Sequence, residues 1–105
     1  MLLSKQSVQS LLVLGQMLSV ARLQRRWSQQ ELATRLGVSR ITVRAIEAGQ
    51  AKTAIGTVFE AAVLLGIPLM THDKKQLSHW QTTLDNFKSL LPTRPRKKPE
   101  IDDDF

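Results

Sequence analysis

Residues 28–49 read SQQELATRLGVSRITVRAIEAG, a stretch that predicts two short helices joined by a tight turn. Ser28 and Glu31 have the S-x-x-E spacing of a capping box, in which each side chain bonds to an unpaired N–H at the helix start. Gly37 is suited to end the first helix, because glycine adopts the left-handed C-cap conformation without steric cost. Ser39 follows where a side-chain oxygen can cap the second helix. This succession is typical of a helix-turn-helix, in which the second helix enters the DNA major groove.

Apolar residues give each of these helices a buried face. The first helix repeats Leu32, Ala33 and Leu36 at helical spacing, and the second places Val43 and Ile46 three residues apart. The residues left on the open face of the second helix are Arg40, Ile41, Arg44 and Ala45. The first turn of such a helix reaches base edges, so we expect its arginine to recognise a base, most simply guanine through O6 and N7.

The positive charge of the chain is concentrated around these helices. The 105 residues have a net charge of +6. Residues 22–52 carry seven Lys and Arg against two Glu, whereas residues 92–105 carry four charges of each sign. A local basic excess is the electrostatic footprint of phosphate binding, although an ordinary soluble surface can have the same composition. Combined with the helix-turn-helix spacing, the charge favours duplex DNA as the partner.

The flanking segments extend this unit on both sides. We expect residues 1–12 to form a loose N-terminal arm that leads into a first helix. Thr57 and Glu60 repeat the capping-box spacing and predict the start of another helix, which Gly66 ends. The helix-turn-helix domain is therefore expected to span residues 13–67.

Residues 67–71 read IPLMT and predict a short strand, because the proline cannot continue a helix. A lone strand leaves its backbone hydrogen bonds unsatisfied, and the rest of the chain offers no clear partner strand. The simplest partner is the same segment of a second copy, which predicts a homodimer. The predicted dimerisation residues are Pro68, Leu69, Met70 and Thr71.

An amphipathic helix is predicted after Asp73, so residues 68–91 combine the strand with this helix. Its apolar side chains alternate four and three apart along the sequence: Leu77, Trp80, Leu84, Phe87 and Leu91. We favour the interpretation that this stripe covers the protein's own core; a dimer or partner surface is the alternative.

Residues 92–105 hold three prolines, four basic residues and four acidic residues, and predict a disordered tail. The basic half could contact DNA phosphates, and the acidic end could dock on a basic partner. A tail that only increases solubility is the alternative.

The helix-turn-helix resembles the DNA-binding domain of Cro/C1-type proteins, the phage-repressor-like or XRE family, over roughly residues 13–67. The matching residues are Gln29, Leu32, Ala33, Gly37, Val38, Ser39, Ile46, Glu47 and Gly49. The resemblance implies that Gln29 anchors the helix start to phosphate and that Arg22 forms an ion pair with Glu47. Family members often have Asn after this Glu, where it contacts the DNA backbone, but this chain has Ala48.

Residues 56–70 read GTVFEAAVLLGIPLM and resemble the corresponding region of HipB-type antitoxins. Trp27, directly before the Ser-Gln of the helix start, is similar as well. The resemblance implies an antitoxin that represses its own operon, pairs through a strand across a homodimer and binds a HipA-type Ser/Thr kinase toxin. Three-gene versions of this system contain a further small antitoxin.

Together these patterns predict an all-α protein: a five-helix, phage-repressor-like helix-turn-helix domain with a short C-terminal strand that pairs across a dimer. The expected function is that of a DNA-binding repressor and antitoxin, with operator DNA and a HipA-like kinase toxin as partners. A stand-alone regulator without a toxin and a protein-interaction adaptor without DNA binding are the alternatives. The candidate DNA-contacting residues are Ser28, Gln29, Ser39, Arg40, Ile41, Thr42, Arg44, Ala45 and Lys52.

No enzyme motif is recognisable in the chain, so we expect no catalytic residue. The sequence has no cysteine, which excludes disulfides and thiolate metal sites, and no glycine-rich phosphate loop. His72 and His79 lie seven apart without further ligands nearby, so neither a metal site nor a cofactor is expected. The longest mostly apolar run, residues 58–70, is too short to span a bilayer, and a cytoplasmic location is the default expectation.

Overall fold

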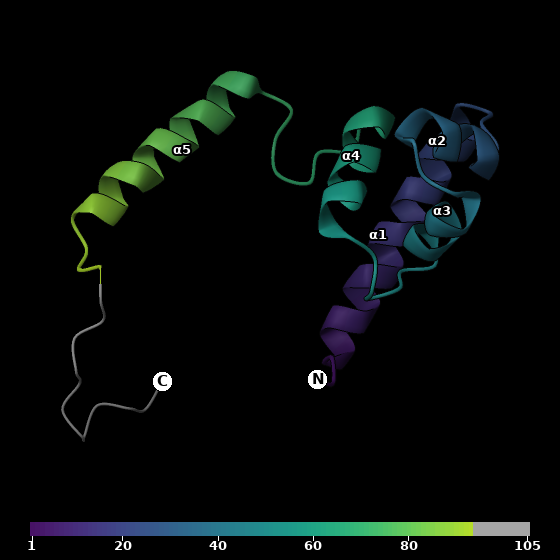
Figure 1. The fold of residues 1–105 in the computed structure, drawn as a ribbon, viewed down its shortest axis with the longest axis horizontal. Helices are drawn as coiled ribbons and strands as arrows, with labels where there is room; N and C mark the ends of the chain where they lie inside the picture. Colours follow the sequence, from purple (N-terminus) through teal and green to yellow (C-terminus); the bar gives the residue numbers. More distant parts are fainter. Residues whose placement is uncertain (94–105) are drawn as a thin grey trace. The chain divides into compact units, whose positions relative to one another are not determined.

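The computed structural model describes residues 1–93, in which all regular structure is α-helical. The helices are α1 (Lys5–Gln24), α2 (Gln29–Leu36), α3 (Arg40–Glu47), α4 (Ile55–Leu65) and α5 (Lys74–Ser89). The chain divides into two compact units, one from Met1 to His72 that holds α1–α4, and one from Asp73 that holds α5 (Figure 1). The predicted all-α fold with five helices is confirmed for the residues that the structure describes.

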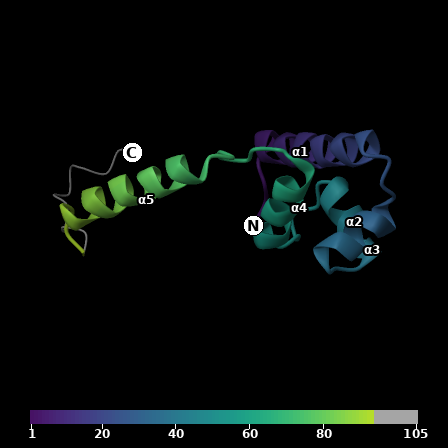
Figure 2. The same cartoon turned by 90° about the horizontal axis from the view of Figure 1, so that it is seen from above.

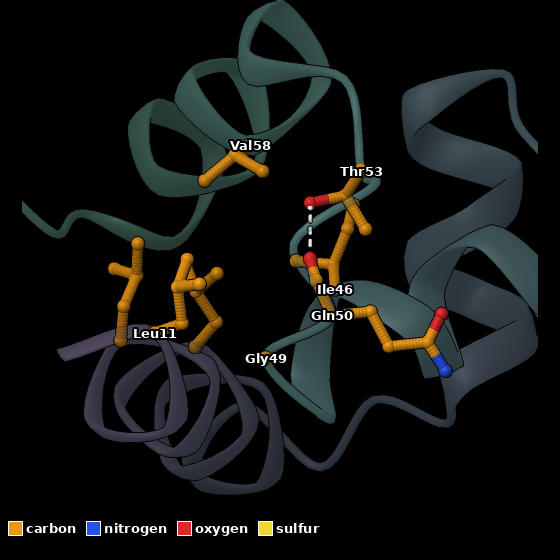
Figure 3. Close-up of a pocket in the computed structure, with 8 residues that line it drawn as sticks. Leu11, Ile46, Gly49, Gln50, Thr53 and Val58 are labelled. Atoms are coloured by element: carbon orange, nitrogen blue, oxygen red, sulfur yellow. Dashed lines mark hydrogen bonds between the residues drawn. The ribbon is translucent and has the colours of Figure 1, made fainter. Parts of the chain in front are cut away.

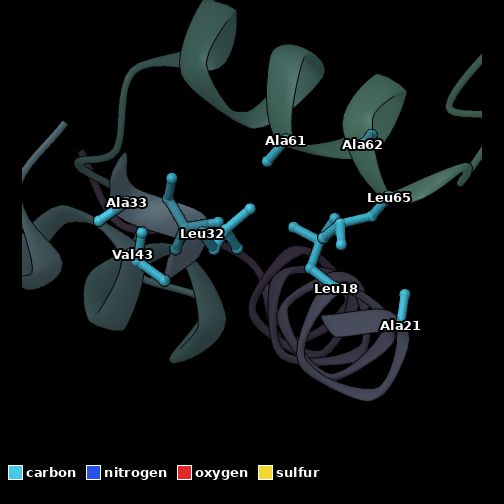
Figure 4. Packing of buried hydrophobic residues seen from close by; sticks show 9 residues of the cluster. Leu18, Ala21, Leu32, Ala33, Val43, Ala61, Ala62 and Leu65 are labelled. Carbon is cyan, nitrogen blue, oxygen red and sulfur yellow. The ribbon is translucent and has the colours of Figure 1, made fainter. Parts of the chain in front are cut away.

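The core of the first unit is formed by side chains from all four of its helices (Figure 4). Leu18 of α1, Leu32 of α2 and Val43 of α3 are each at most 2% exposed. Ala61 and Ala62 of α4 are each 1% exposed, and their small side chains allow a close approach of α4. α1 packs on α3 and α4, and α2 packs on the same two helices. Figure 2 shows α1 along one edge of this unit, with α2, α3 and α4 on the same side of it.

The predicted start and end of α2 and the start of α3 are confirmed. The Glu31 N–H donates to Ser28 Oγ at 3.0 Å, and the Ser28 N–H donates to the Glu31 carboxylate at 3.1 Å. Gly37 ends α2 in the left-handed conformation, with φ of 75°. The Thr42 N–H donates to Ser39 Oγ at 3.2 Å and thereby caps α3. Local hydrogen bonds therefore fix the turn between the two helices.

The first helix starts earlier than predicted. α1 begins at Lys5, so the expectation of a loose arm is wrong for residues 5–12. Ser4 caps this helix by accepting a hydrogen bond from the Ser7 N–H at 3.1 Å. Five of the eight residues from Lys5 to Leu12 are Lys, Gln or Leu, which are good helix formers and favour this earlier start.

α4 also begins before its predicted cap. It starts at Ile55, and the N-cap residue before it, Ala54, makes no side-chain cap. The Val58 N–H already donates to the Ala54 carbonyl at 3.1 Å, so the first turn is formed before Thr57 and Glu60 could cap it. The capping box predicted at this position is therefore wrong, whereas Gly66 ends the helix as expected.

No strand is present in the described part of the chain, so the strand predicted for residues 67–71 is not formed in this single chain. Gly66 turns the chain away from α4 with φ of 74°. Ile67 and Leu69 pack against the core, whereas Met70 is 62% exposed. The burial therefore alternates as it would along a strand, but a strand also needs a hydrogen-bonded neighbour, which is absent here.

α5 begins where predicted, because the Asp73 side chain accepts a hydrogen bond from the Lys75 N–H at 2.9 Å. None of its residues is buried. The core cluster consists of side chains of the first unit. The interpretation that the apolar stripe of α5 covers the protein's own core stays a prediction. The tail predicted for residues 92–105 falls mostly outside the described residues.

Candidate nucleic-acid interface

α3 shows a clear division between buried and exposed side chains. Val43 is 1% and Ile46 5% exposed, which confirms the inward face predicted from their spacing. Ile41 is 75% exposed, and Arg40 and Arg44 are exposed as well. Within residues 1–93, the side chain of neither arginine makes a hydrogen bond or an ion pair. Both guanidinium groups are therefore open to an acceptor from outside the chain.

The hydroxyl groups of Ser39 and Thr42 lie 3.0 Å apart at the start of α3 and share a hydrogen bond. One hydroxyl donates to the other, so this contact uses only one of the two hydroxyl hydrogens. The second hydrogen can be donated to a phosphate oxygen. The capping pair of α3 can thus serve the helix and a DNA backbone at once.

Arg22 of α1 and Glu47 of α3 form the ion pair that the family resemblance implies. Arg22 Nε donates to Glu47 Oε2 at 2.7 Å and Nη2 donates to Oε1 at 3.1 Å, between side chains that are 9% and 7% exposed. Arg22 Nη1 donates to the Trp27 carbonyl at 2.7 Å, and Gln29 Nε2 donates to Glu47 Oε1 at 3.1 Å. One carboxylate therefore joins α1, the start of α2 and the end of α3.

Two opposing effects act on the pKa of Glu47. Burial favours a raised pKa, but the hydrogen bonds from Arg22 and Gln29 and the charge of Arg22 outweigh it, so the pKa is lowered. The carboxylate is therefore charged at neutral pH. The bond to Gln29 was missed from sequence, because the two residues are 18 positions apart. It uses one hydrogen of the amide and leaves the second for a phosphate.

The backbone of α1 lies directly against the backbone at the end of α3, with no side chain between them. A Cβ atom added to Gly15 would overlap the Glu47 carbonyl group and lie 2.9 Å from the Ile46 carbonyl oxygen. Gly49, with φ of +72°, lies against Leu11, where a Cβ would come within 2.7 Å of the carbonyl oxygen (Figure 3). Both positions need glycine for α1 to approach α3 this closely. The spacing motifs did not predict this contact.

The turn after α3 carries Lys52, which is exposed. Thr53 Oγ1 donates to the Gln50 carbonyl at 3.0 Å across this turn (Figure 3). The lysine thus stands on a hydrogen-bonded turn that directly follows the helix.

Several of the positive side chains in residues 22–52 are engaged in contacts within the protein itself. Arg22 is neutralised by its buried partner. The guanidinium groups of Arg35 and Arg25 lie 4.1 and 5.7 Å from the centre of the Trp27 ring, where cation–π attraction holds them. Of the four other cations, Arg26 precedes α2, whereas Arg40, Arg44 and Lys52 lie on α3 or in the turn after it. The candidate interface is therefore more compact than the charge count indicates.

The remaining candidates have defined local roles. Ser28 belongs to the capping box of α2 and is exposed, as is Ser39 at the start of α3. Ala45 is half-buried on α3. The contact of each of these residues with DNA stays a prediction. The predicted dimerisation residues lie beyond α4, outside this group.

A comparison with protein families finds a match over residues 18–70 to the family described as helix-turn-helix. Comparisons with curated proteins and with solved structures find no match. Among residues 1–93, no group of three or more His, Cys, Asp or Glu side chains could hold a metal ion. No helix in that range is both long and apolar enough to cross a membrane.

Proposed function

This chain belongs to the helix-turn-helix family of DNA-binding domains, and from that premise we propose that it is a sequence-specific transcription regulator whose recognition helix is α3. The observation that carries the proposal is the outer face of α3. Arg40, Ile41 and Arg44 are exposed there, while Val43 and Ile46 anchor the opposite face in the core. A face of this kind fits the major groove, where base edges are accessible to a helix.

The proposed contacts follow from position. Arg40, in the first turn of α3, recognises a base, with guanine O6 and N7 as its natural acceptors. The residues assigned to phosphate are Gln29, Thr42, Arg44 and Lys52, and those that complete the contact surface are Ser28, Ser39, Ile41 and Ala45. Phosphate contacts set orientation and affinity, whereas the base contacts set sequence preference.

The test is selection of bound duplexes from a random library by the full chain, followed by affinity measurements at several salt concentrations. Arg40→Ala should cost about 1–3 kcal/mol on the selected duplex and relax preference at one position per half-site. Lys52→Ala should weaken binding to every duplex alike and lower the slope of log affinity against log salt concentration by about one. Lys5→Ala, at the start of α1, removes the same charge and serves as the control. Equal loss on selected and random duplexes for Arg40→Ala would refute base recognition.

We propose further that the regulator acts as a homodimer on a palindromic operator, where it represses transcription. The alternating burial of residues 67–71 supports pairing with the same segment of a second copy. Such a dimer would place two recognition helices about one DNA turn, roughly 34 Å, apart. Met70→Pro removes a backbone donor and should weaken the dimer in sedimentation, while Met70→Ala should not. A protein that stays monomeric at micromolar concentration, with and without DNA, would exclude this arrangement.

We also propose that this repressor is the antitoxin of a HipA-like kinase toxin, controls its own operon and binds the toxin complex. The resemblance of residues 56–70 to HipB-type antitoxins supports this, as does the exposed stripe of α5. Leu77, Leu84 and Phe87 are 42%, 65% and 59% exposed, and an exposed apolar surface of this kind suits a protein partner better than the charged DNA backbone. A stand-alone regulator is the competing function, and it follows from the family assignment alone.

The two functions separate in a binding experiment. The purified chain should bind a kinase-like protein encoded beside its own gene, and Leu84→Ala with Phe87→Ala should weaken that complex while operator affinity is unchanged. Lys88→Ala, at the end of the same helix, is the control. If the native host yields no kinase-like partner and no such gene adjoins this one, the stand-alone regulator is the better account.

A further inference from the structure

The outer face of α3 contains two parallel rows of different chemistry. Arg40 and Arg44 are four residues apart and form a cationic row. Ile41, Ala45 and Ala48 are four and three apart and form an apolar row beside it. Ile41 is 75% exposed, Ala48 is exposed and Ala45 is half-buried. Ile41 is therefore the only long side chain in a row that neither donates nor accepts hydrogen bonds.

The major groove offers such a side chain one favourable partner. Base edges there present hydrogen-bond donors and acceptors, which lose their water without compensation when an aliphatic group covers them. The exception is the C5-methyl group of thymine, which gains from apolar contact. Ile41 lies in the first turn of α3, the part of a recognition helix that comes nearest to the bases. Ala45 and Ala48 lie further along the helix and present only a single methyl group each.

We propose that Ile41 recognises the 5-methyl group of a pyrimidine next to the base bound by Arg40. The inference rests on the proposed function, since it requires α3 to lie in the major groove. The ligand is the methyl group itself, so 5-methylcytosine satisfies Ile41 as well as thymine does. Operator affinity would therefore depend on cytosine methylation at any site where that base replaces the thymine.

The first measurement uses the duplex selected by the full chain and replaces each thymine in turn by deoxyuridine, which removes only the methyl group. One position in each half-site should lose affinity by about fourfold per replacement, the effect of burying a single methyl group. Ile41→Ala should bind the thymine duplex more weakly and show no further loss with deoxyuridine. Ile41→Val, which keeps a branched apolar side chain, should retain part of the difference.

The chain offers a matched control in Ile55, which is 74% exposed at the start of α4. Ile55→Ala removes an equally exposed isoleucine and should leave the ratio of thymine to deoxyuridine affinity unchanged. A second arm places a C·G pair at the sensitive position. Methylation of that cytosine should raise the affinity of the natural chain by about fourfold and leave that of Ile41→Ala unchanged.

Two outcomes would overturn the inference: no thymine is sensitive to loss of its methyl group, or the sensitivity persists in Ile41→Ala. Both leave the proposed function intact, because the duplex is still bound selectively. Failure to select any duplex would instead remove the proposed function.

Discussion

Arg22→Met tests whether the buried ion pair holds the helix-turn-helix together. The substitution keeps most of the apolar stem of Arg22 but removes its charge, so the Glu47 carboxylate stays buried without its cationic partner and keeps only uncharged side-chain donors such as Gln29. The Trp27 carbonyl loses its hydrogen bond as well. Because the paired side chains are only 9% and 7% exposed, water cannot replace these contacts without local opening of the structure.

The expected cost is about 3–5 kcal/mol, the usual penalty for stranding one partner of a buried pair. A domain of this size has a total stability of roughly 4–11 kcal/mol, so the variant should lose a large share of it. At about 4–8 °C per kcal/mol, the melting temperature should fall by at least about 12 °C. The double variant Arg22→Met with Glu47→Leu removes both charges and should recover much of this loss.

Thermal unfolding followed by helical circular dichroism measures the effect. Arg26→Met is the matched control, because Arg26 is exposed and makes no ion pair within the described residues. Its melting temperature should stay close to that of the natural chain, as is usual for exposed substitutions. If Arg22→Met and Arg26→Met melt at the same temperature, the pair does not contribute in the way that its geometry indicates.

Three further outcomes follow from the same region. Because the pKa of Glu47 is lowered below its ordinary value of about 4.5, its stabilising contribution is complete above that pH and is lost as the pH falls through the folded-state pKa. Urea unfolding of the natural chain and of Glu47→Gln should therefore converge on acidification, and parallel curves would contradict the assignment. Gly15→Ala forces a methyl group against the end of α3 and should lower the free energy of unfolding by about 3 kcal/mol. Gly56→Ala, whose added methyl group meets no atom within 4 Å, should raise the free energy of unfolding by up to about 1 kcal/mol in the same measurement. Gly49→Ala should lower the melting temperature more than Gly37→Ala, because both have positive φ but only Gly49 faces a backbone neighbour; equal losses would show that strain alone matters.

Most of the helix-turn-helix could be predicted from sequence because its signals are local. The capping box of Ser28 and Glu31, the left-handed Gly37 and the cap at Ser39 each act within four residues, and all three are present in the structure. The predicted starts of α1 and α4 lie later in the sequence than the observed ones, Lys5 and Ile55. α4 starts at Ile55, and its N-cap residue Ala54 has no side chain that can cap the helix, so no residue type marks the start.

The features that were missed depend on residues far apart in the sequence. Gln29 bonds to Glu47 only because α1, α2 and α3 converge on one carboxylate, which no spacing pattern expresses. The segment of residues 67–71 has the composition and the alternating burial of a strand, but hydrogen bonding to a neighbour is not a property of the segment itself. The stripe of α5 likewise specifies an apolar face and not the surface that covers it.

α3 has only eight residues, too few to be a stable helix in isolation, so its orientation has to come from the rest of the unit. Its end is held by the carboxylate of Glu47 and by the contact of Gly49 with α1, and its start is held by the Ser39 cap. None of these supports uses the side chains of Arg40 or Ile41. The residues that stabilise the helix are therefore separate from those proposed to recognise bases, and sequence preference can change through the second group while the first keeps the fold intact.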